Sequence, residues 1–145
     1  MSTASNKALS RRWYEEIFNQ GKLEVADEIC AAGYVNVDPY GPPGGWPVGP
    51  AATKAVVGTY RTAFPDVVFT VEDQIAEADK VTTRWTAHGT HTGSLPGGIG
   101  PTGKSAVISG ISIERYENGK MAESRVSWDF MGLLQQLGII PTPGS

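Results

Sequence analysis

Four segments in the second half of the chain alternate in residue type as β-strands do, and short turns join the first to the second and the third to the fourth. They cover residues 67–78, 81–93, 104–116 and 121–129. Each is rich in Val, Ile, Thr or aromatic residues, which strands favour. The pair Asn118-Gly119, a strong β-hairpin signal, separates the last two segments. Consecutive strands joined by tight turns pair in antiparallel fashion, so the sequence predicts an antiparallel sheet here.

The first half of the chain has helical periodicity instead. Residues 5–19 predict a helix, because Leu9, Trp13 and Ile17 recur every four residues and Ser5 can cap it. The other predicted elements are a helix over 22–31, a short strand-like segment over 34–38, a helix from Pro50 to about residue 64, and a helix over 132–137. Helices followed by a meander indicate an α+β fold, with three helices packed against one face of a curved sheet and a pocket between the two layers.

The strand predicted over residues 81–93 has two chemically different faces, because successive side chains point to opposite sides. The polar face carries Arg84, Thr86 and His88. The other face carries Thr83, Trp85 and Ala87. We expect the polar face to line the pocket. We expect the second, partly apolar face to form the surface through which two chains associate as a homodimer.

Two loops rich in glycine and proline interrupt the elements, at residues 39–50 and 94–103. The first also carries Tyr40 and Trp46. Two interpretations stay open for it: Trp46 covers the edge of the core, or the loop closes over the pocket as a lid.

Composition excludes several classes of protein. The chain has 145 residues, which predicts a single domain over 1–145. A net charge of −3 gives no reason to expect a nucleic-acid or anionic-membrane partner. Cys30 is the only cysteine, so no disulfide can form within the chain. No apolar run is long enough to span a membrane, and the first residues lack the apolar core of a signal peptide, so we expect a cytoplasmic protein.

Several short motifs together resemble the SnoaL-like polyketide cyclases of the nuclear-transport-factor-2-like superfamily. They are N-x-D-P at 36–39, Y-R-x-A-F-P-D at 60–66, R-W-x-x-x-G-T-H-x-G at 84–93, P-T-G-K at 101–104, G-I-S-I-x-R at 110–115, and N-G-K through W-D to G-L-L-Q-Q-L-G within 118–138. The resemblance spans nearly the whole chain. It implies a cone-shaped α+β barrel, a homodimer, and an apolar pocket that holds a small carbonyl compound. It also implies an intramolecular aldol ring closure, or a related isomerase-type reaction, without a metal or an organic cofactor.

An aldol closure needs a base and a donor for the developing enolate oxygen. We expect Asp129 or Asp38 to move the proton, and Arg84 with His88 to polarise the oxygen. Structural alternatives stay open for each: Asp129 as a helix cap or a partner of Arg84, Asp38 as a turn residue, and His88 as a surface residue at a strand end.

Seven further residues are expected to contact the substrate, namely Tyr14, Tyr34, Asn36, Trp46, Ser112, Val126 and Trp128. The chain departs from the family at two positions, since Val126 and Val37 stand where many members carry a titratable side chain. Two other functions therefore stay open. One is a non-catalytic protein that binds small apolar ligands. The other is an enzyme similar to limonene epoxide hydrolase, with Tyr34, Asn36 and Asp129 around a water.

Overall fold

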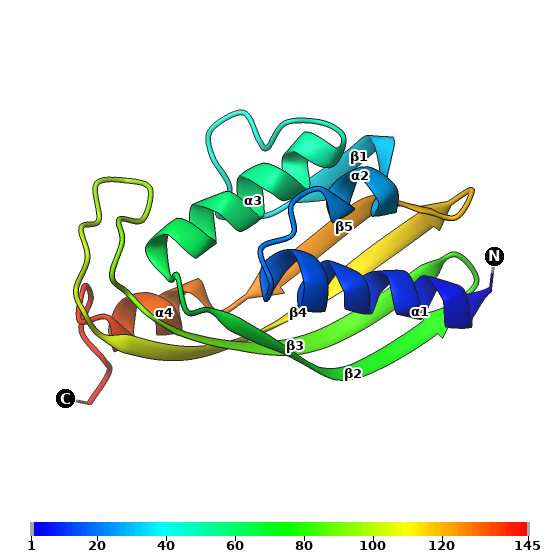
Figure 1. The fold of residues 1–145 in the computed structure, drawn as a ribbon. Coiled ribbons are helices and arrows are strands. Elements are labelled where there is room, and N and C mark those ends of the chain that lie inside the picture. The colour runs from blue at the N-terminus through cyan, green and yellow to red at the C-terminus, as the bar shows by residue number, and fades with distance from the viewer. Residues whose placement is uncertain (1, 145) are drawn as a thin grey trace.

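The computed structural model describes residues 2–144 and contains one five-stranded sheet with helices on its inner face (Figure 1). The helical elements are α1 (Thr3–Arg12), the π-helical segment η1 (Trp13–Phe18), α2 (Val25–Ile29), α3 (Pro50–Ala63) and α4 (Phe130–Gln136). The strands are β1 (Cys30–Val37), β2 (Val68–Glu77), β3 (Lys80–Thr90), β4 (Ser105–Glu117) and β5 (Lys120–Trp128). The predicted α+β class is confirmed. Within the described residues, no helix has the length and apolar character needed to cross a bilayer.

The sheet has the order β1-β5-β4-β3-β2, and strands β2 to β5 form the predicted antiparallel meander. The hairpin between β4 and β5 is confirmed in detail, because Asn118 and Gly119 both have positive φ angles, of 51° and 77°. Strand β1 adds a feature that the sequence did not predict: it pairs in parallel with β5. It begins at Cys30, so the helix expected over 22–31 is shortened to α2. The sheet is curved and open, with β1 and β2 at its edges, rather than a closed barrel.

The predicted first helix consists of two segments. Ser2, not Ser5, is its N-cap, and Ser5 returns a hydrogen bond from the third helical position, which makes a capping box. From Trp13 onward the helix continues as the wider π-helical segment η1. There the amide of Asn19 donates to the carbonyl of Tyr14, five residues earlier. Trp13 and Tyr14 are both buried in this wider turn. Such π-helical turns occur mostly as single turns within longer helices and often accompany functional sites.

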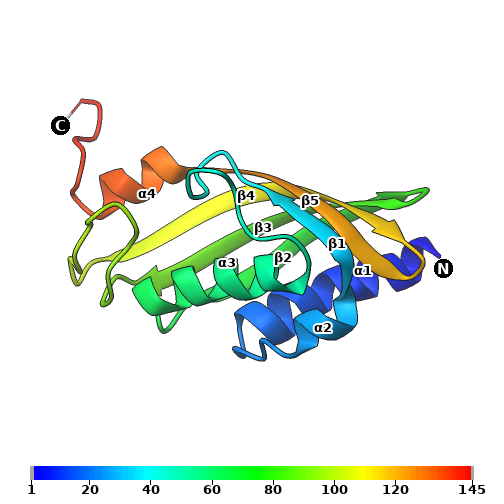
Figure 2. The same cartoon turned by 90° about the horizontal axis from the view of Figure 1, so that it is seen from above.

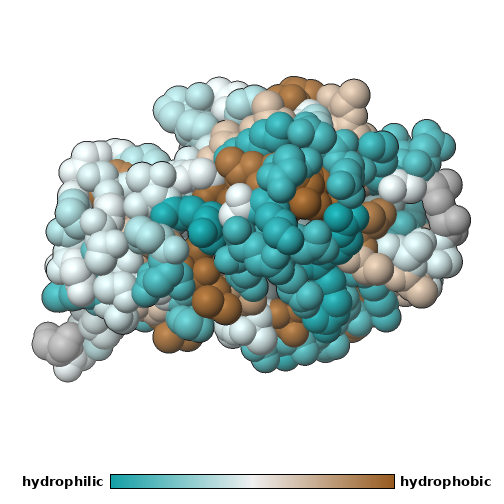
Figure 3. All heavy atoms as spheres, in the orientation of Figure 1, coloured by the Kyte–Doolittle hydropathy of each residue, from teal (hydrophilic) through white to brown (hydrophobic). Residues whose placement is uncertain are grey.

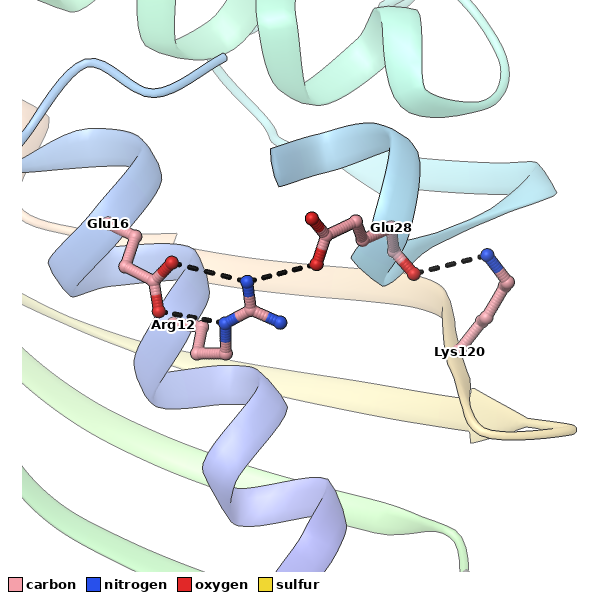
Figure 4. Close-up of polar contacts among 4 residues, drawn as sticks. All are labelled: Arg12, Glu16, Glu28 and Lys120. Carbon is pink, nitrogen blue, oxygen red and sulfur yellow. Dashed lines mark hydrogen bonds and ion pairs between the residues drawn. The ribbon is translucent and has the colours of Figure 1, made fainter. Parts of the chain in front are cut away.

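Ion pairs tie the first helical segment to its neighbours at the surface. The guanidinium of Arg12 donates to Glu16 and, over 3.0 Å, to Glu28, while Lys120 donates to the backbone carbonyl of Glu28 (Figure 4). The solvent side of α1 is mainly hydrophilic, with hydrophobic atoms at its borders (Figure 3). Exposed pairs of this kind contribute little to stability, about 0–1 kcal/mol each. Their role is to fix α2 beside α1.

The helices cover the face of β3 opposite to the one predicted. Along β3 the buried residues are Val81, Thr83, Trp85, Ala87 and Gly89, whereas Arg84 and His88 are exposed. The views in Figures 1 and 2 agree that α1, α2 and α3 all lie on one side of the sheet. A sheet covered on one face buries its apolar residues there and leaves its arginines in water. The expectation that this face lines the pocket was therefore wrong for Arg84 and Thr86.

Candidate functional site

A cavity lies between the helical layer and the inner face of the sheet. Its walls are contributed by η1, α3, β1 to β5 and the start of α4. Most of the lining side chains are apolar or aromatic, including Trp13, Val56, Phe64, Phe69, Trp85, Ile108, Met121 and Trp128. The cavity has roughly 100 Å³ of free space, several times the ~10–15 Å³ that one water requires. The interior is thus hollow at this place rather than filled by side chains.

The floor of the cavity depends on a glycine. An added Cβ on Gly110 would lie 2.3 Å from Cζ2 of Trp85, so the indole lies directly over this residue of β4. The Nε1 of Trp85 donates to the hydroxyl of Ser112 over 3.2 Å, which fixes the ring in this position. Any larger residue at position 110 would displace the indole, and the shape of the cavity would change with it.

Glu114 lies at the deep end of the cavity and is only 1% exposed. Its Oε1 accepts hydrogen bonds from Ser10 and, over 3.1 Å, from Thr83. Its Oε2 has no hydrogen-bond partner within residues 2–144. Burial raises the pKa of this carboxyl to about 8, and the hydrogen bonds from Ser10 and Thr83 offset only part of that effect. Glu114 is therefore mainly a neutral carboxylic acid at pH 7.

Sequence reasoning missed Glu114. Strand β4 alternates, so Glu114 shares the inner face with Ser112 and Gly110. The outer face carries Val107, Ile111 and Ile113, which are 64%, 46% and 45% exposed. The more apolar face of β4 is thus the exposed one, and alternation in the sequence cannot show which face the helices cover. The available signal was the row of small residues on the inner face, which leaves room for a cavity.

The second carboxyl group of the cavity is Asp38, just after the end of β1. Its Oδ1 accepts hydrogen bonds from Nε1 of Trp128 over 3.2 Å and from the amide of Tyr40 over 2.9 Å. The phenol of Tyr60 is close enough to Asp38 to interact with its charge. Burial, and secondarily that charge, raise the pKa of the phenol. Tyr40, Tyr60 and Phe130 pack around the Trp128 indole with ring centroids 5.3–5.8 Å from it. Asp38 thus lies in an aromatic setting.

The register of the sheet gives the relative position of the two carboxyl residues. Ser124 of β5 pairs with Asn36 of β1 on one side and with Glu114 of β4 on the other. Glu114 is therefore two strand spacings, roughly 10 Å, from Asn36. Asp38 lies two residues, roughly 7 Å, farther along β1. Both side chains line the same cavity on the inner face of a curved sheet, so a compact molecule can contact both.

Asn36 and Tyr34 form a pair beside Ser124. The amide nitrogen of Asn36 donates to the Tyr34 hydroxyl over 3.2 Å, and the Oδ1 of Asn36 is buried without a partner within the described residues. Asn36 lines the cavity, whereas the ring of Tyr34 is fully buried behind it. Burial raises the pKa of Tyr34, so its hydroxyl stays protonated. The carbonyl oxygen of Asn36 is therefore available to accept a hydrogen bond from a ligand.

Asp129, Arg84 and His88 are not at the deep end of the cavity. The Oδ1 of Asp129 accepts from the amide of Gly132 over 2.8 Å, so this residue is the N-cap of α4, the structural alternative considered above. Asp129 and Arg84 are both exposed and border an open depression on the outer face of the sheet. His88 is exposed on β3 but is among the residues that line the cavity. The expected grouping inside the pocket was wrong for Asp129, which is a helix cap, and for Arg84, which follows the outward-facing register of β3. Of the three, His88 lines the cavity.

Replacement of the cap should affect stability alone. We expect Asp129→Ala to lower the free energy of unfolding by about 1 kcal/mol, since the amide of Gly132 loses its partner. Asp129→Asn is the control, because an asparagine can cap the helix equally well. Urea denaturation measures both variants. A loss of ligand binding in the cavity together with unchanged stability in Asp129→Ala would contradict the assignment.

The remaining predicted contacts divide into two groups. Tyr14, Ser112, Val126 and Trp128 line the cavity, so their contact with a substrate stays a prediction. Trp46 does not line it. This half-buried indole lies against Gly41, whose added Cβ would be 2.8 Å from Nε1, and packs against the edge of the core. The covering interpretation of loop 39–50 fits this position of Trp46, and the lid interpretation of Trp46 does not.

Known proteins resemble this chain in both sequence and fold. The sequence profile of the SnoaL-like polyketide cyclases matches residues 8–137. The chain is 31% identical over 122 residues to nogalonic acid methyl ester cyclase of Streptomyces nogalater, covering 83% of this chain and 89% of that one. Among solved structures, a protein of Acidithiobacillus ferrooxidans assigned to the polyketide cyclases superimposes with a TM-score of 0.83 at 29% identity, over 96% of this chain and 99% of that chain.

Two further solved structures share the fold. TsrD of Streptomyces laurentii has a TM-score of 0.85 at 24% identity, over 97% of this chain and 99% of that chain. AclR of Streptomyces galilaeus, assigned as a hydroxylase, has a TM-score of 0.81 at 26% identity, over 97% and 85% of the two chains. The fold thus occurs with more than one assigned chemistry. By its sequence profile and its relatives, this chain belongs to the SnoaL-like polyketide cyclase family.

Proposed function

We propose that this protein is a cofactor-free cyclase that closes a ring in a small, mostly apolar carbonyl compound, with the cavity between helices and sheet as its active site. The observation that carries the proposal is the cavity itself, in which two carboxyl groups lie among apolar and aromatic side chains. Their environments differ: Glu114 is fully buried, and Asp38 is half-buried beside Trp128. Carboxyl groups in different environments can divide the roles of acid and base.

In the proposed reaction Asp38 is the base. Its carboxylate removes a proton from the carbon between two carbonyl groups, and the resulting enolate attacks a second carbonyl in the same molecule. A carbon–carbon bond forms, the attacked carbonyl oxygen takes up a proton, and the product is an isomer of the substrate. The name of the related nogalonic acid methyl ester cyclase supports a methyl ester of a polyketide acid as the substrate class. The aromatic side chains around Asp38 exclude water from the reacting carbon.

Turnover of open-chain 1,3-dicarbonyl methyl esters tests the proposal. Incubation with the protein should give a ring-closed product of unchanged mass and altered chromatographic retention, faster than in buffer. Tight binding of the same esters without any product would instead identify a binding protein. The apolar residues Val126 and Val37 favour that second function, since they remove two titratable groups that many family members carry.

The proposal includes a homodimer that forms through the outer face of the sheet. The residues expected there from the sequence, Thr83, Trp85 and Ala87, are buried inside the chain and cannot take part. The apolar residues of the outer face are instead Val107, Ile111 and Ile113 of β4. Exposed apolar residues clustered on a sheet are typical of association surfaces.

Light scattering tests the dimer. We expect twice the mass of one chain for the native protein and a shift toward one chain for Ile111→Glu, because the new charge would be buried in the contact. Val48→Glu is the matched control: Val48 is 64% exposed, as Val107 is, but lies in loop 39–50. A native protein that stays monomeric at every concentration tested would refute this part of the proposal.

A further inference from the structure

The deep end of the cavity contains the carboxyl group of Glu114, which has no role in the reaction step proposed above for Asp38. Glu114 is 1% exposed and lines the cavity, and its Oε2 is buried without a partner within residues 2–144. A buried polar atom without a partner is costly, and each such atom in a native protein calls for an explanation, of which a catalytic role is one. The cavity is the side from which a partner can come.

We infer that Glu114 binds the carbonyl oxygen of the ligand, donating a hydrogen bond from Oε2 as a neutral carboxylic acid, so that a ketone enters the cavity oxygen first. This inference rests on the proposed function, because it names the group that holds the oxygen in the same site. A carboxylic acid kept neutral in an apolar site can stabilise a developing enolate oxygen without itself titrating.

The hydrogen bonds around Glu114 fix which oxygen donates. Ser10 and Thr83 both donate to Oε1, and their own hydroxyl oxygens lie 3.0 Å apart. Thr83 in turn accepts from the side-chain amide of Gln74 over 3.2 Å. Oε1 is therefore the accepting oxygen of the acid, and the proton resides on Oε2.

The surroundings keep the acid neutral. No cationic side chain among the described residues forms an ion pair with Glu114. The phenols of Tyr14 on η1 and Tyr116 on β4 both interact electrostatically with Glu114. Burial raises the pKa of both phenols, so neither carries a charge below pH 10. Asn36, in the same transverse row, already donates from its side-chain amide to the Tyr34 hydroxyl, and its buried Oδ1 is an acceptor.

A pair of ligands of the same shape tests the inference by equilibrium binding. Acetophenone and α-methylstyrene differ in that a C=O of the first is a C=CH₂ in the second. The native protein should prefer acetophenone by roughly 2- to 10-fold, the usual value of one neutral hydrogen bond. Glu114→Met should abolish this preference. Glu114→Gln should keep it, because the side-chain amide still donates. Glu117→Met, the same substitution at an exposed residue at the end of β4, should also keep it.

Other results would overturn the inference. They are no preference for acetophenone in the native protein, an unchanged preference in Glu114→Met, a lost preference in Glu117→Met, or stronger binding of the cation 1-phenylethylamine than of acetophenone. If Glu114→Met does not fold, the pH dependence of ligand binding to the native protein tests the inference by itself. Its preference for acetophenone should hold up to pH 7 and fall as pH rises past about 8, when Oε2 loses its proton. A preference that is constant from pH 6 to 9.5 would overturn the inference.

These binding measurements are separate from the test of the proposed function. A preference that depends on Glu114, found in a protein that turns over no ester, would support the oxygen site and refute the cyclase. Turnover that requires Asp38, found together with a ligand preference that is unchanged in Glu114→Met, would support the cyclase and refute the oxygen site.

Discussion

Asp38→Asn should lower kcat for ring closure by about 10²- to 10⁴-fold while the affinity for the substrate changes little. This range is the usual contribution of a positioned general base. The variant keeps the site intact, because an asparagine oxygen can still accept from Nε1 of Trp128 and from the amide of Tyr40. The charge and the ability to take up a proton are lost.

Steady-state kinetics and calorimetry together measure this result. Asp129→Asn is the matched control, since it removes the same charge from a carboxyl residue outside the cavity and keeps the helix cap. It should retain full turnover. Equal losses of turnover in the two variants, or full turnover in Asp38→Asn, would show that Asp38 is not the base.

Glu114 should make the native protein less stable as pH rises from 5 to 8. Burial raises its pKa from 4.5 to about 8, so in this range the folded chain holds a proton that the unfolded chain has released. The stabilisation from this proton is complete below pH 4.5 and is lost as pH rises through about 8. At about 1.4 kcal/mol per pH unit, three units give a loss on the order of 4 kcal/mol.

Glu114→Gln isolates this effect, because it removes the titration and leaves the remaining ionisable groups in place. The difference in unfolding free energy between the native protein and Glu114→Gln, measured with urea at each pH, should change by that amount between pH 5 and 8. The native protein should lose stability relative to Glu114→Gln as pH rises. A difference that stays constant with pH, or that changes with the opposite sign, would mean that Glu114 is ionised in the folded chain.

Most of the fold follows from patterns within single elements. Helix α3 begins at Pro50 as predicted, and the hairpin at Asn118-Gly119 joins two strands as predicted, because both signals are local. Strand β1 was foreseen only as a short strand-like segment. Its pairing partner β5 is about 90 residues away in the chain, so no local pattern predicts the parallel contact.

The site was harder to predict, since alternation along a strand does not reveal which face becomes the interior. On β3 the conspicuous residue Arg84 faces outward, and Trp85 lines the cavity. On β4 the apolar residues Ile111 and Ile113 face outward, and Glu114 faces inward. Asp38 and Asn36 were identified correctly as cavity residues, because they precede a loop at a strand end where a family motif places them.

The indole N–H resonances of the four tryptophans test the central claim, that ligands bind between the helices and the sheet. Trp13, Trp85 and Trp128 line the cavity, and Trp46 does not. On titration with acetophenone, the first three resonances in a ¹⁵N correlation spectrum should shift with one common dissociation constant, and that of Trp46 should stay in place. A shift of Trp46 alone, or saturating binding that moves none of the other three, would contradict the account.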